Sequence, residues 1–278
     1  MQKNRGEGES RMSHLNLNGA RLYYEEEGEG QPILFIHGVW MSGRFFKKQV
    51  PYFAQHYRVI VPDLRSHGRS AHVHFGHTVA SYAQDIHTMI NELGLRDVVL
   101  AGWSMGSFVI WDYFKQFGSE NVMATIVIDQ SASDFTSPDW PMGLFDFTGL
   151  CQMMAAVQTD REKAVREFIP LMFKEAPSEE DTRWMFDEIT RLPESVASAI
   201  LFDQTLQDYR PILPSINIPT LLCFGRDEKL YPVAAGEHLH QNLSDARLVV
   251  FEESSHCPFL EEPRRFNQEV DQFIQSLR

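Results

Sequence analysis

The chain has 278 residues, of which 43% are hydrophobic, and this is enough apolar material for the core of one α/β domain. Its net charge of -13 repels phosphate backbones and anionic lipids, so the composition argues against nucleic acid and against membranes as partners. No apolar run approaches the roughly eighteen residues of a membrane span, and the three cysteines lack metal-ligand spacing. An odd number of cysteines without such spacing favours a reduced, cytoplasmic protein, and the polar start of the chain lacks the apolar region of a secretory signal.

The first elements along the chain predict a β-hairpin. After a polar extension over 1–13, two alternating segments at 14–18 and 20–26 flank Asn18-Gly19, a strong signal for a tight turn between paired strands. Short apolar runs typical of buried parallel strands follow at 33–36, 59–61, 98–101, 124–128, 220–224 and 247–251. Helical patterns separate several of these runs and end the chain, over 78–93, 107–117 and 266–277. This alternation predicts an α/β fold with a mostly parallel sheet.

The strand signals stop between 131 and 219, where helical patterns rich in Phe, Met and Trp take over. We interpret 135–212 as a helical cap inserted into a core made of 14–134 and 213–278. Most of the large apolar residues in such a cap pack it onto the core, and a minority line a ligand pocket. The aromatic residues that we expect to contact a substrate are Trp40, Trp103, Trp140 and Phe145.

One motif stands between the apolar run at 98–101 and the helix at 107–117: Gly102-Trp103-Ser104-Met105-Gly106. A serine between two glycines at a strand-to-helix turn is typical of a nucleophile elbow. The turn strains the serine backbone, and the glycines remove the Cβ atoms that would clash there. Ser104 is therefore the candidate nucleophile.

A serine nucleophile needs a base, and it needs donors for the oxyanion that forms. His256 lies on the loop after the last predicted strand, where this architecture brings an imidazole to the elbow. Gly38 lets the chain turn sharply after the strand at 33–36, so that the N–H of Val39 can face the serine. The N–H of Met105 supplies a second donor.

Together these motifs resemble the α/β-hydrolase superfamily over residues 15–277. The segments that carry the resemblance are Phe35-Ile36-His37-Gly38, Pro62-Asp63-Leu64-Arg65-Ser66-His67-Gly68-Arg69-Ser70, Gly102-Trp103-Ser104-Met105-Gly106, Gly225-Arg226-Asp227-Glu228 and Ser255-His256. Within the superfamily the chain is similar to capped esterases, lactonases and the so-called non-haem chloroperoxidases. The resemblance implies an eight-stranded, mostly parallel sheet flanked by helices, with a helical cap and no cofactor.

Two carboxylates are candidates for the acid of the triad. In many relatives the acid lies three residues after the glycine that ends the next-to-last strand, which corresponds to Glu228. In another subset it ends the strand after the elbow helix, which corresponds to Asp129. We favour Asp129, because an unpaired carboxylate would be costly at the end of an apolar strand, whereas Glu228 lies in a charged turn that water can solvate.

These features predict a serine hydrolase that cleaves small to medium carboxylic esters or lactones through a Ser-His-acid triad and an acyl-enzyme. Two other functions fit the same fold: hydrolysis of a carbon–carbon bond or cofactor-free dioxygenation of a ring, and non-enzymatic binding of a small ligand. No metal is expected, because His72, His74 and His77 lack a carboxylate or cysteine at ligand spacing. The expected partner is a small-molecule ester or lactone, and homo-oligomerisation is left open.

Overall fold

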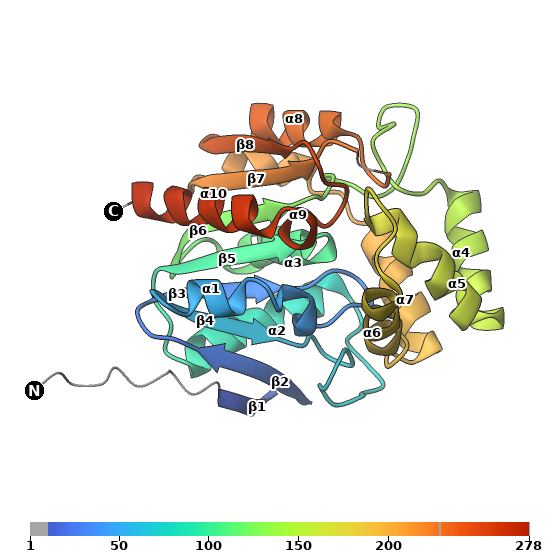
Figure 1. Cartoon of the computed structure of the whole chain (residues 1–278), viewed down its shortest axis with the longest axis horizontal. Coiled ribbons are helices and arrows are strands. Elements are labelled where there is room, and N and C mark those ends of the chain that lie inside the picture. Colours follow the sequence, from blue (N-terminus) through green and yellow to red (C-terminus); the bar gives the residue numbers. More distant parts are fainter. Residues whose placement is uncertain (1–10, 228, 278) are drawn as a thin grey trace, which may run out of the picture.

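The structure, a computed structural model, describes residues 11–227 and 229–277. Eight strands form one sheet in the order β1-β2-β4-β3-β5-β6-β7-β8 (Figure 1). Their bounds are β1 (Arg11–Leu17), β2 (Ala20–Glu27), β3 (Gln31–Ile36), β4 (Tyr57–Pro62), β5 (Val98–Trp103), β6 (Val122–Ile128), β7 (Thr220–Gly225) and β8 (Ala246–Phe251). Strand β2 pairs antiparallel with both β1 and β4, and every other pairing is parallel. The predicted α/β fold with a mostly parallel, eight-stranded sheet is confirmed.

The hairpin turn lies at the predicted dipeptide. Asn18 and Gly19 both have positive φ, at 46° and 80°, as the turn between two directly paired strands requires. Strand β1 begins at Arg11, three residues earlier than the expected strand at 14, because its pairing with β2 continues as far as Glu26.

The ends of the central parallel strands meet at one edge of the sheet. Ile36 at the end of β3 pairs with Gly102 of β5, and Ile128 at the end of β6 pairs with Trp103 on one side and Cys223 on the other. The loops that follow these strands therefore leave the sheet side by side. In open α/β sheets, ligands bind outside this carboxyl edge.

Helices cover both faces of the sheet, with α1 and α10 in front and α2 and α3 behind in Figure 1. The helices that belong to the core rather than to the segment between β6 and β7 are η1 (Gly43–Phe46), α1 (Val50–Phe53), α2 (Val79–Glu92), α3 (Met105–Phe117), α8 (Val233–Asn242), α9 (Pro258–Glu261) and α10 (Pro263–Ser276). Helix α2 starts where the Thr78 hydroxyl accepts the Ser81 N–H at 3.1 Å, which satisfies an N–H that has no acceptor within the helix.

A second group of helices lies between β6 and β7 in the chain: α4 (Phe147–Thr159), α5 (Arg161–Phe168), η2 (Ile169–Met172), α6 (Glu179–Ile189), α7 (Glu194–Thr205) and η3 (Arg210–Ser215). Helices α4 to α7 lie together beyond the carboxyl edge of the sheet, to the right in Figure 1. All four fall within 135–212, the segment expected to form the cap, and we refer to α4 to α7 with the loops that connect them as the cap. Among the described residues, no helix has the length and apolar character that a bilayer crossing requires.

Candidate active site

Ser104 lies at the sharp turn between β5 and α3, with φ 51° and ψ -124°. Such angles are strained for any residue with a Cβ atom, and they are held by the surrounding packing. A Cβ on Gly102 would lie 2.5 Å from the Gly106 backbone, and a Cβ on Gly106 would lie 2.2 Å from the Ile36 carbonyl oxygen. Both glycines are therefore required by close backbone approach. The Ser104 N–H donates to the Ile128 carbonyl at 2.9 Å, which fixes the turn against β6.

His256 lies on the loop between β8 and α9 and is almost completely buried. Its Nδ1 is 3.4 Å from Oδ1 of Asp129, and its carbonyl oxygen accepts the indole N–H of Trp103 at 2.9 Å. The loop also passes very close to the end of β7, where a Cβ on Gly225 would lie 2.1 Å from the Ser255 oxygen. These contacts hold the histidine loop against the same edge that presents Ser104.

Asp129 follows β6 and is fully buried, with φ 48°. Its Oδ2 accepts the Gly225 N–H at 2.8 Å, and its own N–H donates to the Cys223 carbonyl at 2.9 Å. One carboxylate oxygen is thus held by β7 while the other faces His256. A carboxylate in this position can orient an imidazole and stabilise its charged form.

The alternative acid, Glu228, lies outside the described residues. Its neighbour Asp227 is half-exposed and forms an ion pair with Lys174 of the cap segment at 2.8 Å.

The expected oxyanion donors flank the nucleophile. A Cβ on Gly38 would lie 3.2 Å from Cβ of Ser104, so the loop that carries Val39 packs directly on the elbow. Met105 is the first residue of α3, and the first N–H groups of a helix have no acceptor within it. His37 supports this loop: its Nε2 accepts the Leu64 N–H at 3.0 Å, and its Nδ1 lies 2.8 Å from the Gly38 carbonyl. Burial lowers the pKa of His37 to about 4, which keeps the ring neutral.

The four aromatic residues expected at the substrate lie in different surroundings. Trp103 is fully buried and packs between Phe45 and Phe259, at ring-centroid distances of 5.3 and 5.0 Å. Trp140 donates its indole N–H to the Ser133 carbonyl at 3.0 Å, and Phe145 is half-buried on the loop before α4. The indole of Trp40 is buried and donates its N–H to a carbonyl of α7.

A buried carboxylate that sequence reasoning missed lies beside the histidine. Asp134 accepts the Tyr231 hydroxyl at 2.8 Å and side-chain N–H groups of Gln130 and of Gln204 from cap helix α7. Burial raises its pKa to about 6. The Tyr231 ring is 5.8 Å from the His256 ring, so this cluster joins the cap to the surroundings of the base. Its position five residues after Asp129, on the same loop, was the only signal in the sequence.

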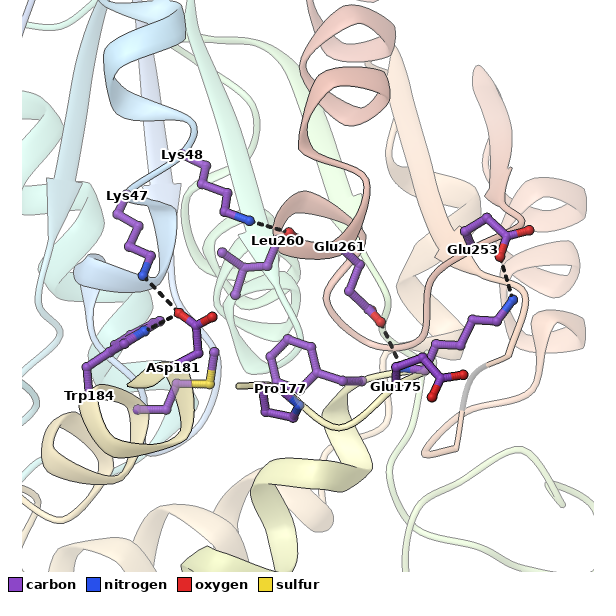
Figure 2. Close-up of a pocket in the computed structure, with 12 residues that line it drawn as sticks. Lys47, Lys48, Glu175, Pro177, Asp181, Trp184, Glu253, Leu260 and Glu261 are labelled. Carbon is purple, nitrogen blue, oxygen red and sulfur yellow. Dashed lines mark hydrogen bonds and ion pairs between the residues drawn. The ribbon is translucent and has the colours of Figure 1, made fainter. Parts of the chain in front are cut away.

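A pocket of about 300 Å³ opens where the cap meets the core (Figure 2). Its lining residues are Lys47, Lys48, Phe173, Lys174, Glu175, Pro177, Asp181, Trp184, Met185, Glu253, Leu260 and Glu261. None of Ser104, Asp129 and His256 lines it. Glu261 connects it to the histidine loop, because its carboxylate accepts both the Lys174 N–H at 2.7 Å and the Ser255 N–H at 2.9 Å.

The described residues include no group of three or more His, Cys, Asp or Glu side chains placed to hold a metal ion. In the histidine-rich segment before α2, Nε2 of His77 lies 3.0 Å from the Val73 carbonyl.

A strained serine after β5, a histidine after β8 and an eight-stranded, mostly parallel sheet are the arrangement of an α/β hydrolase. Residues 33–269 match the sequence profile of the alpha/beta hydrolase family, and the chain belongs to this family.

Known members of the family are similar over almost the whole chain. The AB hydrolase superfamily protein YisY of Bacillus subtilis (strain 168) is 28% identical over 259 residues, which cover 92% of this chain and 96% of that protein. A non-heme haloperoxidase of Rhodococcus erythropolis is 28% identical over 274 residues, covering 93% and 97%. Among solved structures, the esterase EaEST of Exiguobacterium antarcticum superposes with a TM-score of 0.92 at 25% identity, covering 95% of this chain and all of that one.

Proposed function

We propose that this protein is a serine hydrolase that cleaves small to medium carboxylic esters or lactones through an acyl-enzyme. The observation that carries the proposal is the convergence of three residues at one edge of the sheet. Ser104 occupies a strained elbow, and the buried Asp129 lies 3.4 Å from Nδ1 of His256 on the neighbouring loop. The likeness to an esterase and a haloperoxidase of the same family supports this chemistry.

In the proposed mechanism the hydroxyl oxygen of Ser104 attacks the carbonyl carbon while His256 takes the hydroxyl proton. Asp129 holds the imidazole with its proton on Nδ1 and stabilises the imidazolium that forms. The N–H groups of Val39 and Met105 bind the oxyanion, and each such donor contributes about 3 kcal/mol to transition-state stabilisation. His256 then returns the proton to the leaving alcohol. Water hydrolyses the acyl-enzyme by the same steps, and no cofactor takes part.

The choice of Asp129 as the acid rests on its burial and on its two partners. A buried carboxylate costs free energy unless it is hydrogen-bonded and paired, and Asp129 has the Gly225 N–H on one oxygen and His256 beside the other. The proposed assignment makes Glu228 dispensable for the chemical steps.

Ser104→Ala tests the function, and Ser107→Ala is its matched control. Ser107 is also buried, lies one turn further along in α3 and donates its hydroxyl to the Gly102 carbonyl at 2.8 Å, so its loss removes a structural bond only. We expect the native protein and Ser107→Ala to hydrolyse p-nitrophenyl butyrate and to react with a fluorophosphonate probe. Ser104→Ala should do neither.

Other outcomes would favour the two other functions. Ester turnover at the native rate by Ser104→Ala would refute a serine nucleophile. Conversion of an aromatic ring by Ser104→Ala would favour cofactor-free dioxygenation. Ligand binding without any turnover by the native protein would favour a receptor.

A further inference from the structure

Trp40 occupies an unusual backbone position beside the proposed oxyanion donor. The Met41 N–H donates to the Gly38 carbonyl at 3.2 Å, which closes a four-residue turn with Val39 and Trp40 in its middle. Trp40 is the third residue of this turn and has φ 66°. Turns with a positive φ at that position favour glycine, and a bulky side chain there is strained. The conformation of the turn therefore depends on contacts made by the Trp40 side chain.

Those contacts come from the cap. The indole N–H of Trp40 donates to the Ala197 carbonyl of α7 at 3.0 Å. Its ring meets the edge of Phe168, at the end of α5, with centroids 5.5 Å apart. The side chain is 2% exposed, so it is enclosed between two cap helices although its backbone belongs to the loop after β3. One residue thus joins the cap to the turn that carries Val39.

A buried cation, Arg161, also contacts the Trp40 indole. Its guanidinium carbon lies 5.3 Å from the centre of the Trp40 ring, and its Nη2 donates to the Ile189 carbonyl at 2.9 Å. The residue is 7% exposed, and its Nε and Nη1 have no hydrogen-bond partner among the described residues. Burial lowers the pKa of Arg161, as expected for a charge that is poorly compensated. The face of the indole and the charge of Glu194 therefore both stabilise this buried cation.

The first residue of the same turn, Gly38, lies against the nucleophile, since a Cβ on Gly38 would be 3.2 Å from Cβ of Ser104. We propose that Trp40 is a positioning residue, which sets the Val39 N–H for the oxyanion only while α5 and α7 hold its indole. Docking of the cap and assembly of the oxyanion hole are then one event. This inference rests on the proposed hydrolase function, and it gives Trp40 a role other than contact with the substrate.

Trp40→Phe tests the coupling, with Trp184→Phe as its matched control. The phenyl ring stays apolar but loses the N–H to Ala197. Trp184 also lies where the cap meets the core (Figure 2). Its ring centroid is 4.9 Å from that of Phe45 and its indole N–H donates to Asp181 at 2.8 Å, and neither of these partners belongs to the turn at 38–41. It therefore reports the general effect of loosening the cap.

With p-nitrophenyl butyrate we expect Trp40→Phe to lower kcat at least about tenfold, with KM changed less than about threefold, since misplaced oxyanion donors weaken the transition state rather than substrate binding. Its affinity for an alkyl trifluoromethyl ketone, whose adduct places an oxyanion at the same donors, should fall by the same factor. Trp184→Phe should change neither quantity more than about twofold. A rise in KM at constant kcat in Trp40→Phe, or equal losses in both variants, would overturn the proposal.

A second pair of variants leaves the turn itself untouched. Arg161→Met keeps the volume over the indole but removes its cation, whereas Arg166→Met removes a cation from the same helix that lies 4.1 Å from the Phe186 ring. We expect a loss of kcat of about threefold or more in Arg161→Met only, since the Trp40 ring loses its charged partner. Equal kcat values in the two variants would exclude Arg161 from the coupling.

A measurement without substrate separates this inference from the proposed function. Hydrogen exchange of the amides over 36–41 should be faster in Trp40→Phe than in the native protein and in Trp184→Phe. If the native protein hydrolyses no ester, the proposed function fails, while the exchange data still decide whether the cap holds the turn. Unchanged exchange in Trp40→Phe would overturn the coupling even in an active enzyme.

Discussion

Replacing Asp129 with Asn changes the hydrogen bonds of His256 without changing the shape of the side chain. In the native protein the Gly225 N–H donates to Oδ2 of Asp129 at 2.8 Å. In the variant this N–H still needs an acceptor, because a buried donor without one costs about 1–3 kcal/mol. The amide oxygen of Asn therefore takes the Oδ2 position, and the amide NH2 faces Nδ1 of His256. Two donors cannot face each other, so the imidazole must hold its proton on Nε2.

That tautomer cannot accept the proton of Ser104, and the variant also lacks the negative charge that stabilises the imidazolium. The expected loss is about 10³ to 10⁴ in kcat, which corresponds to about 4 to 5.5 kcal/mol of additional barrier. KM and thermal stability should change little, since the volume and the Gly225 bond are kept.

The assay is steady-state hydrolysis of p-nitrophenyl butyrate by Asp129→Asn, Glu228→Gln and Asp227→Asn at pH 7.5. Asp227 is the matched control, because its carboxylate is half-exposed and paired with Lys174 at the surface. We expect Glu228→Gln and Asp227→Asn to lose about tenfold or less, which is about 1.4 kcal/mol. A large loss of kcat in Glu228→Gln together with a small loss in Asp129→Asn would refute the reasoning and make Glu228 the acid. Two mild variants would mean that the carboxylates replace one another, which the double variant would reveal.

Four further predictions follow from the same contacts. Ser104→Ala should melt within about 2 °C of the native protein, since alanine meets the same backbone strain; a larger shift by calorimetry would show a structural role. Gly106→Ala should unfold or lose several kcal/mol in urea titration, because its Cβ would lie 2.2 Å from the Ile36 oxygen; native stability would contradict this. His37 has a pKa of about 4, below its unfolded value, so its contribution to stability is lost as the pH falls. This contribution falls by about 2 kcal/mol between pH 7 and 5. Burial also lowers the pKa of His67, so His37→Gln should keep a pH dependence but lose about 2 kcal/mol less than the native protein in urea titrations at the two pH values; equal losses would contradict this. Prolonged treatment with EDTA should leave ester hydrolysis unchanged, and a loss restored by a divalent metal would reveal a metal site.

The sequence by itself determined the features that depend on neighbouring residues. The elbow is contiguous, because a strained serine turn needs its two glycines within two residues on either side, and the hairpin turn likewise needs Asn18 and Gly19 together. Strands buried on both faces are continuous apolar runs, so the sheet and its alternation with helices could be recognised from their order alone.

The tertiary structure decided which distant groups meet. In the sequence, Asp129 and Glu228 are two carboxylates that each follow a strand. The structure places Asp129 against His256, whereas Glu228 lies outside the described residues, so the choice between them stays a proposal. No local sequence pattern predicted the hydrogen bonds of Asp134 or the position of the Trp40 side chain between two cap helices. Each joins a loop at the edge of the sheet to the cap, which is inserted between β6 and β7. Such contacts depend on how the cap packs on the core. No local hydrophobic period or turn motif indicates which side chains will meet where the cap and the core touch.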